Sequence, residues 1–305
     1  MRALLVFNPT AGGGRAGRLA PRVAARLAAD GVEVCQHRTR SLEDARLAAG
    51  EAAGGVDAVV AMGGDGTVGA CAAGLADAGP GASTKAALGV VPAGGGNDAA
   101  RSLGLPADPV AAAGLLTRLT RRPADLAAVA GRGYLNVAGA GFDSEVNRVA
   151  NQHPGWAGNH PRYVGAVLAQ LAVGRTARFR LVLDGHAQEV SGWLIAVANG
   201  PSYGGGMHVA PRASLADGLL DVIVIADIGK LEFLRTFPKV FTGRHIEHPA
   251  VAVHRAAAVE LDADRPLHVY ADGEPAGTLP ATFEVRRAAL TVLAADPAPG
   301  FPPPG

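Results

Sequence analysis

The sequence predicts an α/β N-terminal domain on a mostly parallel sheet, followed by a β-rich sandwich domain. The first third of the chain repeats one unit: a short apolar strand, a glycine turn and a helix. Such alternation is typical of parallel strands covered by helices on both faces. Beyond Pro123 the pattern changes to short extended runs separated by turns, which favours an antiparallel sandwich. The 305 residues are enough for two sizeable cores.

In the first domain, apolar runs predict strands at 3–7, 32–38, 58–62 and 88–92. The helices expected between and after them lie near 17–30, up to residue 49, at 68–78 and at 108–119. Ser41 and Asp44 form a capping-box pattern at the start of the second of these helices. The first domain is therefore expected to comprise residues 1–123.

In the second domain, extended runs occur at 124–129, 134–138, 177–183, 188–199 and 220–226. Amphipathic helices are expected near 162–172 and 229–241. We assign residues 124–295 to this domain. The proline-rich stretch 296–305 is predicted to be a disordered tail.

The composition excludes several classes of protein. The net charge is +1 and no run of Lys or Arg occurs, which argues against a nucleic-acid groove. Neither a signal peptide nor an apolar run long enough to span a bilayer is visible. The two cysteines, Cys35 and Cys71, are expected to be reduced core residues. A soluble, cytoplasmic protein is predicted.

The turn around Asp65 carries the first chemical signal. Gly63, Gly64 and Gly66 leave the backbone accessible, and the helix that follows presents free N–H groups to an anion. A carboxylate in a phosphate cradle repels its ligand unless it holds a cation or accepts a proton. This combination indicates phosphoryl transfer, although glycines at a strand-to-helix turn also occur for steric reasons alone.

Two further turns repeat this design. Residues 8–15 follow the first strand with three glycines, and residues 92–98 follow the fourth, where Asn97 or Asp98 is expected to cap a helix. The carboxyl ends of parallel strands share one edge of a sheet, where open α/β sheets bind ligands. The three turns are therefore expected to meet.

These motifs resemble those of the diacylglycerol kinase catalytic family, which includes sphingosine and ceramide kinases. The matching segments are 8–12, 63–67, 92–101 and Asp272-Gly273-Glu274, in the same order along the chain. The resemblance implies an active site in a cleft between the two domains, with ATP and Mg²⁺ as cofactors. It also implies a nucleotide site made of Asn8, Pro9, Thr10, Ala11, Gly12, Thr39, Gly64, Asp65, Gly66, Thr67, Gly95, Asn97 and Asp98.

The Asp272-Gly273-Glu274 motif has two interpretations. By itself it is typical of a type I′ hairpin turn. The resemblance implies that Glu274 accepts the proton of the substrate hydroxyl, while Asp272 and Asp65 hold Mg²⁺ or orient that hydroxyl. Asp65 is the alternative base, and the sequence leaves this choice open.

A second Mg²⁺ site is implied at 214–221, where the family has an Asp-Gly-Leu turn. Asp217 would supply a carboxylate, and Ser214 and Leu219 would supply backbone oxygens. The alternative is that this segment is only a tight turn leading into a strand.

The predicted function is an ATP- and Mg²⁺-dependent lipid kinase acting on diacylglycerol or a similar lipid. The alternatives are an NAD kinase-like enzyme and a non-catalytic lipid- or nucleotide-binding protein. Gly95 and Gly69-Ala70 depart from the family pattern, which has polar residues there. A homodimer remains an open alternative to a monomer.

A lipid substrate requires transient contact with a membrane surface. Trp156, in the loop 153–160, is the first candidate for this contact. The second is an apolar stripe at helical spacing, whose alternative role is to form core: Phe233, Leu234, Phe237, Val240 and Phe241.

Overall fold

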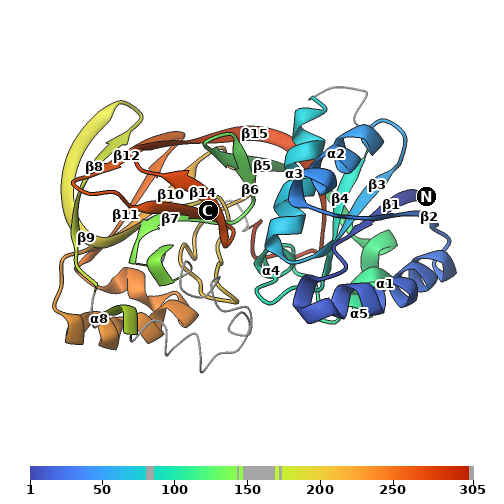
Figure 1. The fold of residues 1–305 in the computed structure, drawn as a ribbon, viewed down its shortest axis with the longest axis horizontal. Coiled ribbons are helices and arrows are strands. Elements are labelled where there is room, and N and C mark those ends of the chain that lie inside the picture. Colours follow the sequence, from blue (N-terminus) through green and yellow to red (C-terminus); the bar gives the residue numbers. More distant parts are fainter. Residues whose placement is uncertain (80–85, 143, 147–168, 172–173, 302–305) are drawn as a thin grey trace.

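The computed structural model describes residues 1–79, 86–142, 144–146, 169–171 and 174–301 and shows two lobes side by side (Figure 1). The first lobe alternates strands and helices in the predicted order. Its elements are β1 (Arg2–Phe7), α1 (Ala11–Ala29), β2 (Glu33–Arg38), α2 (Leu42–Ala52), β3 (Ala58–Gly63), α3 (Asp65–Asp77), β4 (Ala87–Pro92), α4 (Asp98–Ser102), α5 (Pro109–Leu115) and the 3-10 turn η1 (Leu116–Arg118).

The sheet of the first lobe has the order β2-β1-β3-β4, and all of these neighbours are parallel. Every residue of β3 and β4 is buried. Two apolar clusters cover the two faces, one with α2 and α3 and the other with α1 and α5. The predicted α/β fold is confirmed. The predicted cap of α2 is confirmed as well, because Ser41 Oγ accepts a hydrogen bond from Asp44 N at 3.0 Å.

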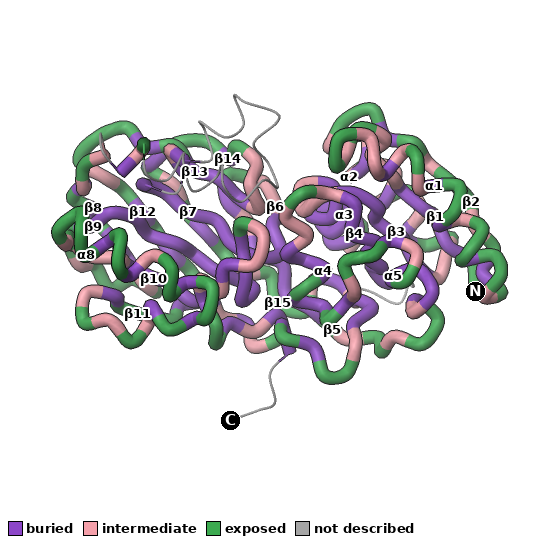
Figure 2. Tube along the Cα trace, turned by 90° about the horizontal axis from the view of Figure 1, so that it is seen from below, coloured by how far each residue is buried: buried purple, intermediate pink, exposed green. Residues whose placement is uncertain are grey.

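The second lobe is built from antiparallel strands, as the sequence predicts. These are β5 (Thr120–Val129), β6 (Arg132–Tyr134), β7 (Val137–Gly141), β8 (Ala177–Leu183), β9 (His186–Ala198), β10 (Leu220–Ala226), β11 (Val251–Ala256), β12 (Ala258–Ala263), β13 (His268–Ala271), β14 (Glu274–Thr278) and β15 (Ala281–Ala294). The long strand β9 pairs with β8 through its first half and with β7 and β10 through its second half. Buried residues run along the strands of both lobes (Figure 2).

Strand β15 joins the two lobes. Its first half pairs with β12 and β5 in the second lobe, while Val292 pairs with Leu88 of β4 in the first. The residues at the start of β5 pair with the end of β15, so this end of the β5–β15 pair extends the first sheet. The first lobe thus contains a C-terminal segment that the predicted range 1–123 does not include.

The tail differs from the prediction of disorder. Residues 296–301 pack onto the first lobe, where Ala298 and Phe301 are buried. Gly300 N donates to Ser102 O at 2.7 Å, and the Arg122 guanidinium lies 5.2 Å from the centre of the Phe301 ring. A proline-rich composition shows no helix or strand period, but isolated apolar side chains can still dock in a core formed elsewhere. Residues 302–305 lie outside the described part.

We expect Phe301→Ala to lower the free energy of unfolding by about 3 kcal/mol, because it removes a buried aromatic side chain. Urea denaturation will measure this difference. Leu47→Ala is the matched control, since Leu47 is 50% exposed and should change stability by less than about 0.5 kcal/mol. Equal stability of Phe301→Ala and the wild type would contradict the packed tail.

The predicted helix at 229–241 is shorter than expected. Helix α8 (Lys230–Thr236) gives way to the 3-10 segment η2 (Phe237–Thr242), followed by η3 (Arg244–Glu247). Pro238 explains the change, because proline has no N–H and its ring clashes with the carbonyl four residues earlier. Most of the predicted helix 162–172 and the loop with Trp156 lie outside the described residues. Within those residues, no helix has the length and apolarity needed to cross a membrane.

Candidate active site

The three glycine turns at the carboxyl ends of β1, β3 and β4 lie directly against one another, as predicted. A β-carbon on Gly12 would collide with Ala93 O, and one on Gly94 would collide with Gly64 Cα. Gly12 also has φ +58°, a value that favours glycine. The glycines are therefore required by the close approach of backbone to backbone.

Asp65 is the first residue of α3 and caps a second helix. Its Oδ1 accepts a hydrogen bond from Ala99 N in the first turn of α4 at 2.8 Å. The predicted capping of this helix by the side chain of Asn97 or Asp98 is wrong. Asn97 instead bonds back to Gly94, with Oδ1 accepting from Gly94 N at 2.8 Å and Nδ2 donating to Gly94 O at 3.0 Å.

Asp98 connects the two lobes. Its Oδ2 accepts from Gly205 N at 2.7 Å and its Oδ1 accepts from Gly206 N at 2.8 Å, both in the loop between β9 and β10. Arg101 Nη1 donates to the same Oδ1 at 2.9 Å. Sequence reasoning missed this loop, although its run of three glycines at 204–206 was a visible signal.

The Asp272-Gly273-Glu274 motif is a hairpin turn between β13 and β14, with φ of +48° at Asp272 and +82° at Gly273. These values agree with the type I′ interpretation. The carboxylate of Asp272 accepts hydrogen bonds from Leu135 N at 2.8 Å and from Asn136 N and Val137 N at 3.1 Å. These three hydrogen bonds therefore fix Asp272, and the turn that it begins, in the second lobe.

Glu274 faces the first lobe. A β-carbon on Gly66 would lie 2.7 Å from Glu274 Oε1, so this carboxylate touches the first turn of α3. Among the described residues, no hydrogen-bond donor is recorded for the Glu274 carboxylate. It therefore differs from Asp272, because its oxygens are available to a ligand.

Burial raises the pKa of all four carboxyl groups. The pKa of Asp65 rises to about 7 because the group is desolvated and Asp98 lies nearby. Desolvation raises the pKa of Asp272 to about 6, against its backbone hydrogen bonds. Desolvation also raises the pKa values of Asp98 and Glu274. Clusters of buried carboxyl groups are typical of sites that bind a cation or in which one carboxylate accepts a proton.

The matches to known proteins cover both lobes. Residues 2–129 match the model of the diacylglycerol kinase catalytic domain. Residues 136–294 match the model of the YegS C-terminal NAD kinase beta sandwich-like domain. The chain belongs to the diacylglycerol kinase family. It is therefore a kinase with the two-part fold that the sequence predicts.

Relatives of this diacylglycerol kinase family member extend over nearly its whole length. A diacylglycerol kinase of Mycobacterium tuberculosis is 39% identical over 294 residues, covering 94% of this chain and 93% of its own. A probable YegS-like lipid kinase of Pseudomonas aeruginosa is 33% identical, with 95% and 93% covered. The crystal structure of a putative diacylglycerol kinase from Bacillus anthracis has a TM-score of 0.80 at 27% identity, with 97% and 96% covered.

The predicted nucleotide-binding positions of this kinase lie on neighbouring strand ends. Asn8 Oδ1 accepts from Thr10 N at 3.1 Å and from Thr10 Oγ1 at 2.9 Å, which shapes the first turn. Thr39 N donates to Phe7 O at 2.9 Å, so Thr39 is buried beside that turn. Gly95 is exposed at the rim of the third turn. A ligand role for these residues stays a prediction.

The carboxyl groups would supply only part of the coordination shell of a Mg²⁺ ion. Within the described segments, no three His, Cys, Asp or Glu side chains are arranged to hold a metal ion. Mg²⁺ commonly uses one or two carboxylates and completes its shell with water and substrate phosphates. The Glu274 carboxylate, which accepts no hydrogen bond from the described residues, and the buried Asp65 fit that kind of site.

The predicted second Mg²⁺ site is a tight turn closed by protein groups. Asp217 forms an ion pair with Arg255, and its Oδ1 accepts from Leu219 N at 3.0 Å. Ser214 Oγ accepts from Ala216 N at 3.3 Å. The Arg255 guanidinium thus places a positive charge at the carboxylate that the resemblance assigns to Mg²⁺, and the metal site stays a prediction.

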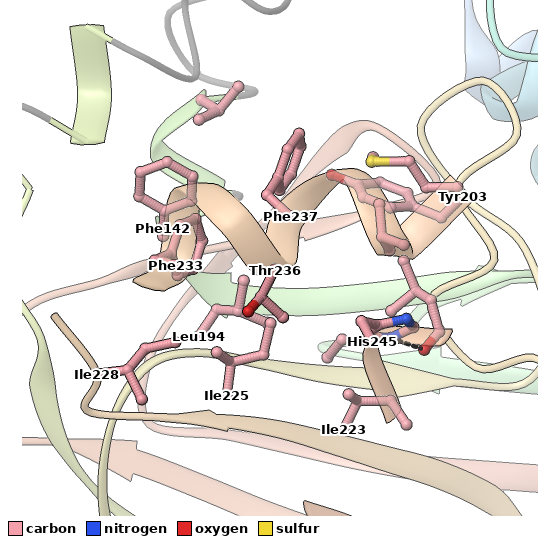
Figure 3. A pocket seen from close by; sticks show the side chains of 15 residues that line it. Phe142, Leu194, Tyr203, Ile223, Ile225, Ile228, Phe233, Thr236, Phe237 and His245 are labelled. Atoms are coloured by element: carbon pink, nitrogen blue, oxygen red, sulfur yellow. Dashed lines mark hydrogen bonds between the residues drawn. The ribbon is translucent and has the colours of Figure 1, made fainter. Parts of the chain in front are cut away.

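An apolar pocket lies apart from the carboxyl groups, between α8–η2 and the strands β9 and β10 (Figure 3). Its lining includes Phe233, Phe237 and Val240, so the core interpretation of the apolar stripe is confirmed for the buried Phe233 and Val240. Tyr203 and Met207 also line it. The same loop carries Gly205 and Gly206, which bind Asp98, and thus connects the pocket with the carboxyl groups.

Proposed function

We propose that the protein transfers the γ-phosphoryl group of ATP, with Mg²⁺, to a hydroxyl of diacylglycerol or a similar lipid. The observation that carries this proposal is the position of Glu274. Its carboxylate, with no recorded hydrogen-bond donor among the described residues, touches the Gly66 turn at the N-terminus of α3. A proton acceptor thus lies beside backbone N–H groups suited to phosphate.

In the proposed reaction, the hydroxyl oxygen forms a bond to the γ-phosphorus as the bond to the β-phosphate oxygen breaks. The hydroxyl proton passes to Glu274, and ADP leaves. Asp272, held by three N–H groups, fixes the turn that positions Glu274. Mg²⁺, when bound, would offset the phosphate charge, with Asp65 as the nearby carboxylate. Asp65 remains the alternative proton acceptor.

The apolar pocket supports a lipid acceptor over NAD. Its polar groups are few, with Thr236 and His245 the polar side chains other than the Tyr203 hydroxyl, and its walls are aliphatic and aromatic. Such walls suit apolar atoms better than a charged dinucleotide, and the cavity volume of about 60 Å³ admits only part of an acyl chain. The loop 203–207 would then place the head of the lipid toward the carboxyl groups.

Incubation with labelled ATP tests the function directly. The acceptors are dioleoylglycerol, sphingosine, ceramide and phosphatidylglycerol in mixed micelles, and NAD in buffer. We expect Mg²⁺-dependent label in the diacylglycerol or another single-headgroup lipid. Label in NAD alone, or in none of the acceptors, would overturn the proposal.

The turn at Asp217 gives a separate prediction about Mg²⁺. If this turn binds Mg²⁺ in exchange for Arg255, added Mg²⁺ should raise the melting temperature, because ligand binding stabilises the folded state. Asp217→Ala should then abolish that response and lower turnover. Differential scanning fluorimetry across Mg²⁺ concentrations without nucleotide will measure it. Equal responses of wild type and Asp217→Ala would leave Asp217 with only its pairing to Arg255.

A further inference from the structure

The segment formed by α8, η2 and η3 has two distinct faces. Its inner face lines the apolar pocket with Phe233, Thr236, Phe237 and Val240. Its outer face exposes three large apolar side chains: Leu231 is 60% exposed, and Leu234 and Phe241 are each 37% exposed. In the part of the chain that the structure describes, six large hydrophobic residues are exposed, and three of them lie on this one segment. Figure 1 shows α8 along one edge of the second lobe.

The same outer face is basic. Arg235, Lys239 and Arg244 are exposed on it. Its two acidic residues are paired, because Glu232 lies 3.2 Å from His248 Nε2 and Glu247 lies 3.5 Å from Arg244 Nε, so Arg244 is itself partly neutralised. Lys239, Thr242, Arg244 and Glu247 line a surface hollow, in which the Thr242 hydroxyl donates to Lys239 O at 3.0 Å. Among the described residues, Arg235 and Lys239 form no ion pair, and they are the exposed cations of this face that can contact an anionic headgroup.

A chain of aromatic rings connects the outer face with the interior. The Phe241 ring centre lies 6.4 Å from that of Phe237, and Phe237 lies 6.2 Å from Phe233. Phe233 in turn lies 5.0 Å from Phe142 and 5.2 Å from Trp193. Apolar surface is thus continuous from the exposed Phe241 into the lining of the pocket.

We propose that this outer face docks on an anionic membrane surface. We define the docking face as Leu231, Leu234, Arg235, Lys239, Phe241 and Arg244. The apolar residues would enter the headgroup region while the basic residues contact anionic headgroups. This position brings the wall of the apolar pocket to the membrane, which is where a long-chain substrate resides. The functional role of this docking rests on the proposed lipid substrate. The binding of the face to an anionic membrane does not.

Vesicle co-sedimentation tests the docking face. We expect the wild type to bind vesicles of phosphatidylcholine with 30% phosphatidylglycerol at least about tenfold more tightly than pure phosphatidylcholine vesicles, and 0.5 M NaCl to remove most of this difference. The double variant Leu231→Ser/Leu234→Ser should bind both kinds of vesicle at least about tenfold more weakly, since burying one leucine side chain corresponds to about a tenfold change. Lys239→Glu should weaken binding only to the anionic vesicles.

Matched variants on the first lobe separate this face from general effects. Leu47→Ser and Arg22→Glu replace exposed residues of α2 and α1 and should bind like the wild type. Melting temperatures will show that the variants are folded. The single variant Leu231→Ser, at the most exposed site, replaces the double variant if the latter unfolds. No binding of the wild type to anionic vesicles, or equal loss in first-lobe controls, would overturn the proposal.

Activity measurements separate the docking proposal from the proposed function. On a short-chain diacylglycerol dissolved below its micelle concentration, the docking-face variants should retain wild-type turnover, whereas on long-chain substrate in anionic vesicles they should lose it in proportion to binding. If no lipid is phosphorylated but the binding differences are found, the docking face stands and the substrate proposal fails. If lipid is phosphorylated without any vesicle binding, the substrate proposal stands and the docking face is overturned.

Discussion

Asp65→Asn is expected to reduce turnover by a factor of about 10² to 10³. The substitution is nearly isosteric but removes the carboxylate from a turn that lies against Gly96 and caps α4. Removal of a group that stabilises charge in a transition state typically costs a factor of 10² to 10³, and loss of a proton acceptor costs a similar amount. The measurement is kcat with labelled ATP and the lipid acceptor that the acceptor panel identifies. Asp262→Asn, at an exposed position of β12, should keep wild-type turnover.

The Asp65→Asn variant should also be more stable than the wild type at neutral pH. The folded-state pKa of Asp65 is raised to about 7 from an ordinary value of 3.8. The stability associated with its protonation is therefore complete below about pH 4 and is lost as the pH rises through 7. At pH 8 the ionised Asp65 lowers the free energy of unfolding of the wild type by at most about 4 kcal/mol. The effect is smaller than this limit because solvent reaches part of the Asp65 side chain.

Urea denaturation with EDTA at pH 4.5, 6 and 8 will measure this penalty without bound metal. We expect Asp65→Asn to exceed the wild type most at pH 8 and to approach it at pH 4.5. A pH-independent difference would show that Asp65 ionises as a solvated carboxyl group. Unchanged turnover would remove Asp65 from the reaction altogether.

Glu274→Gln is expected to lower kcat by a factor of about 10² to 10⁴, the range typical of general base catalysis. The amide keeps the shape of the side chain beside Gly66 but cannot accept the hydroxyl proton. ATP affinity, measured by equilibrium binding, should change by less than about threefold, since Glu274 is assigned to the acceptor hydroxyl. Glu284→Gln, on the exposed side of β15, is the matched control.

The pH profile of kcat/KM decides between the two candidate bases. The wild type should lose activity as the pH falls through the raised pKa of its base. If Glu274 is the base, Glu274→Gln should flatten this acidic limb, whereas Asp65→Asn should leave residual activity with the limb intact. The reverse pattern would transfer the role of base to Asp65.

The order of strands and helices in the first lobe was predictable from the sequence alone. Short apolar runs ending in glycine turns have one compact solution, a parallel sheet with the turns at one edge. The turn at Asp65 and the Asp272–Glu274 hairpin were also predictable, because glycine and the neighbouring polar residues determine the local backbone conformation. These are short-range effects, and a sequence records them directly.

The tertiary structure decided which groups these residues meet. Nothing near Asp98 in sequence indicates that it binds Gly205 and Gly206, more than a hundred residues later. Nothing near Asp217 indicates that Arg255 neutralises it. The burial of Phe301 in the tail was not predictable either, because no periodic apolar pattern surrounds this residue and its contacts come from the first lobe. Partners of charged and isolated apolar side chains are set by long-range packing, since desolvation and pairing depend on every element that surrounds them.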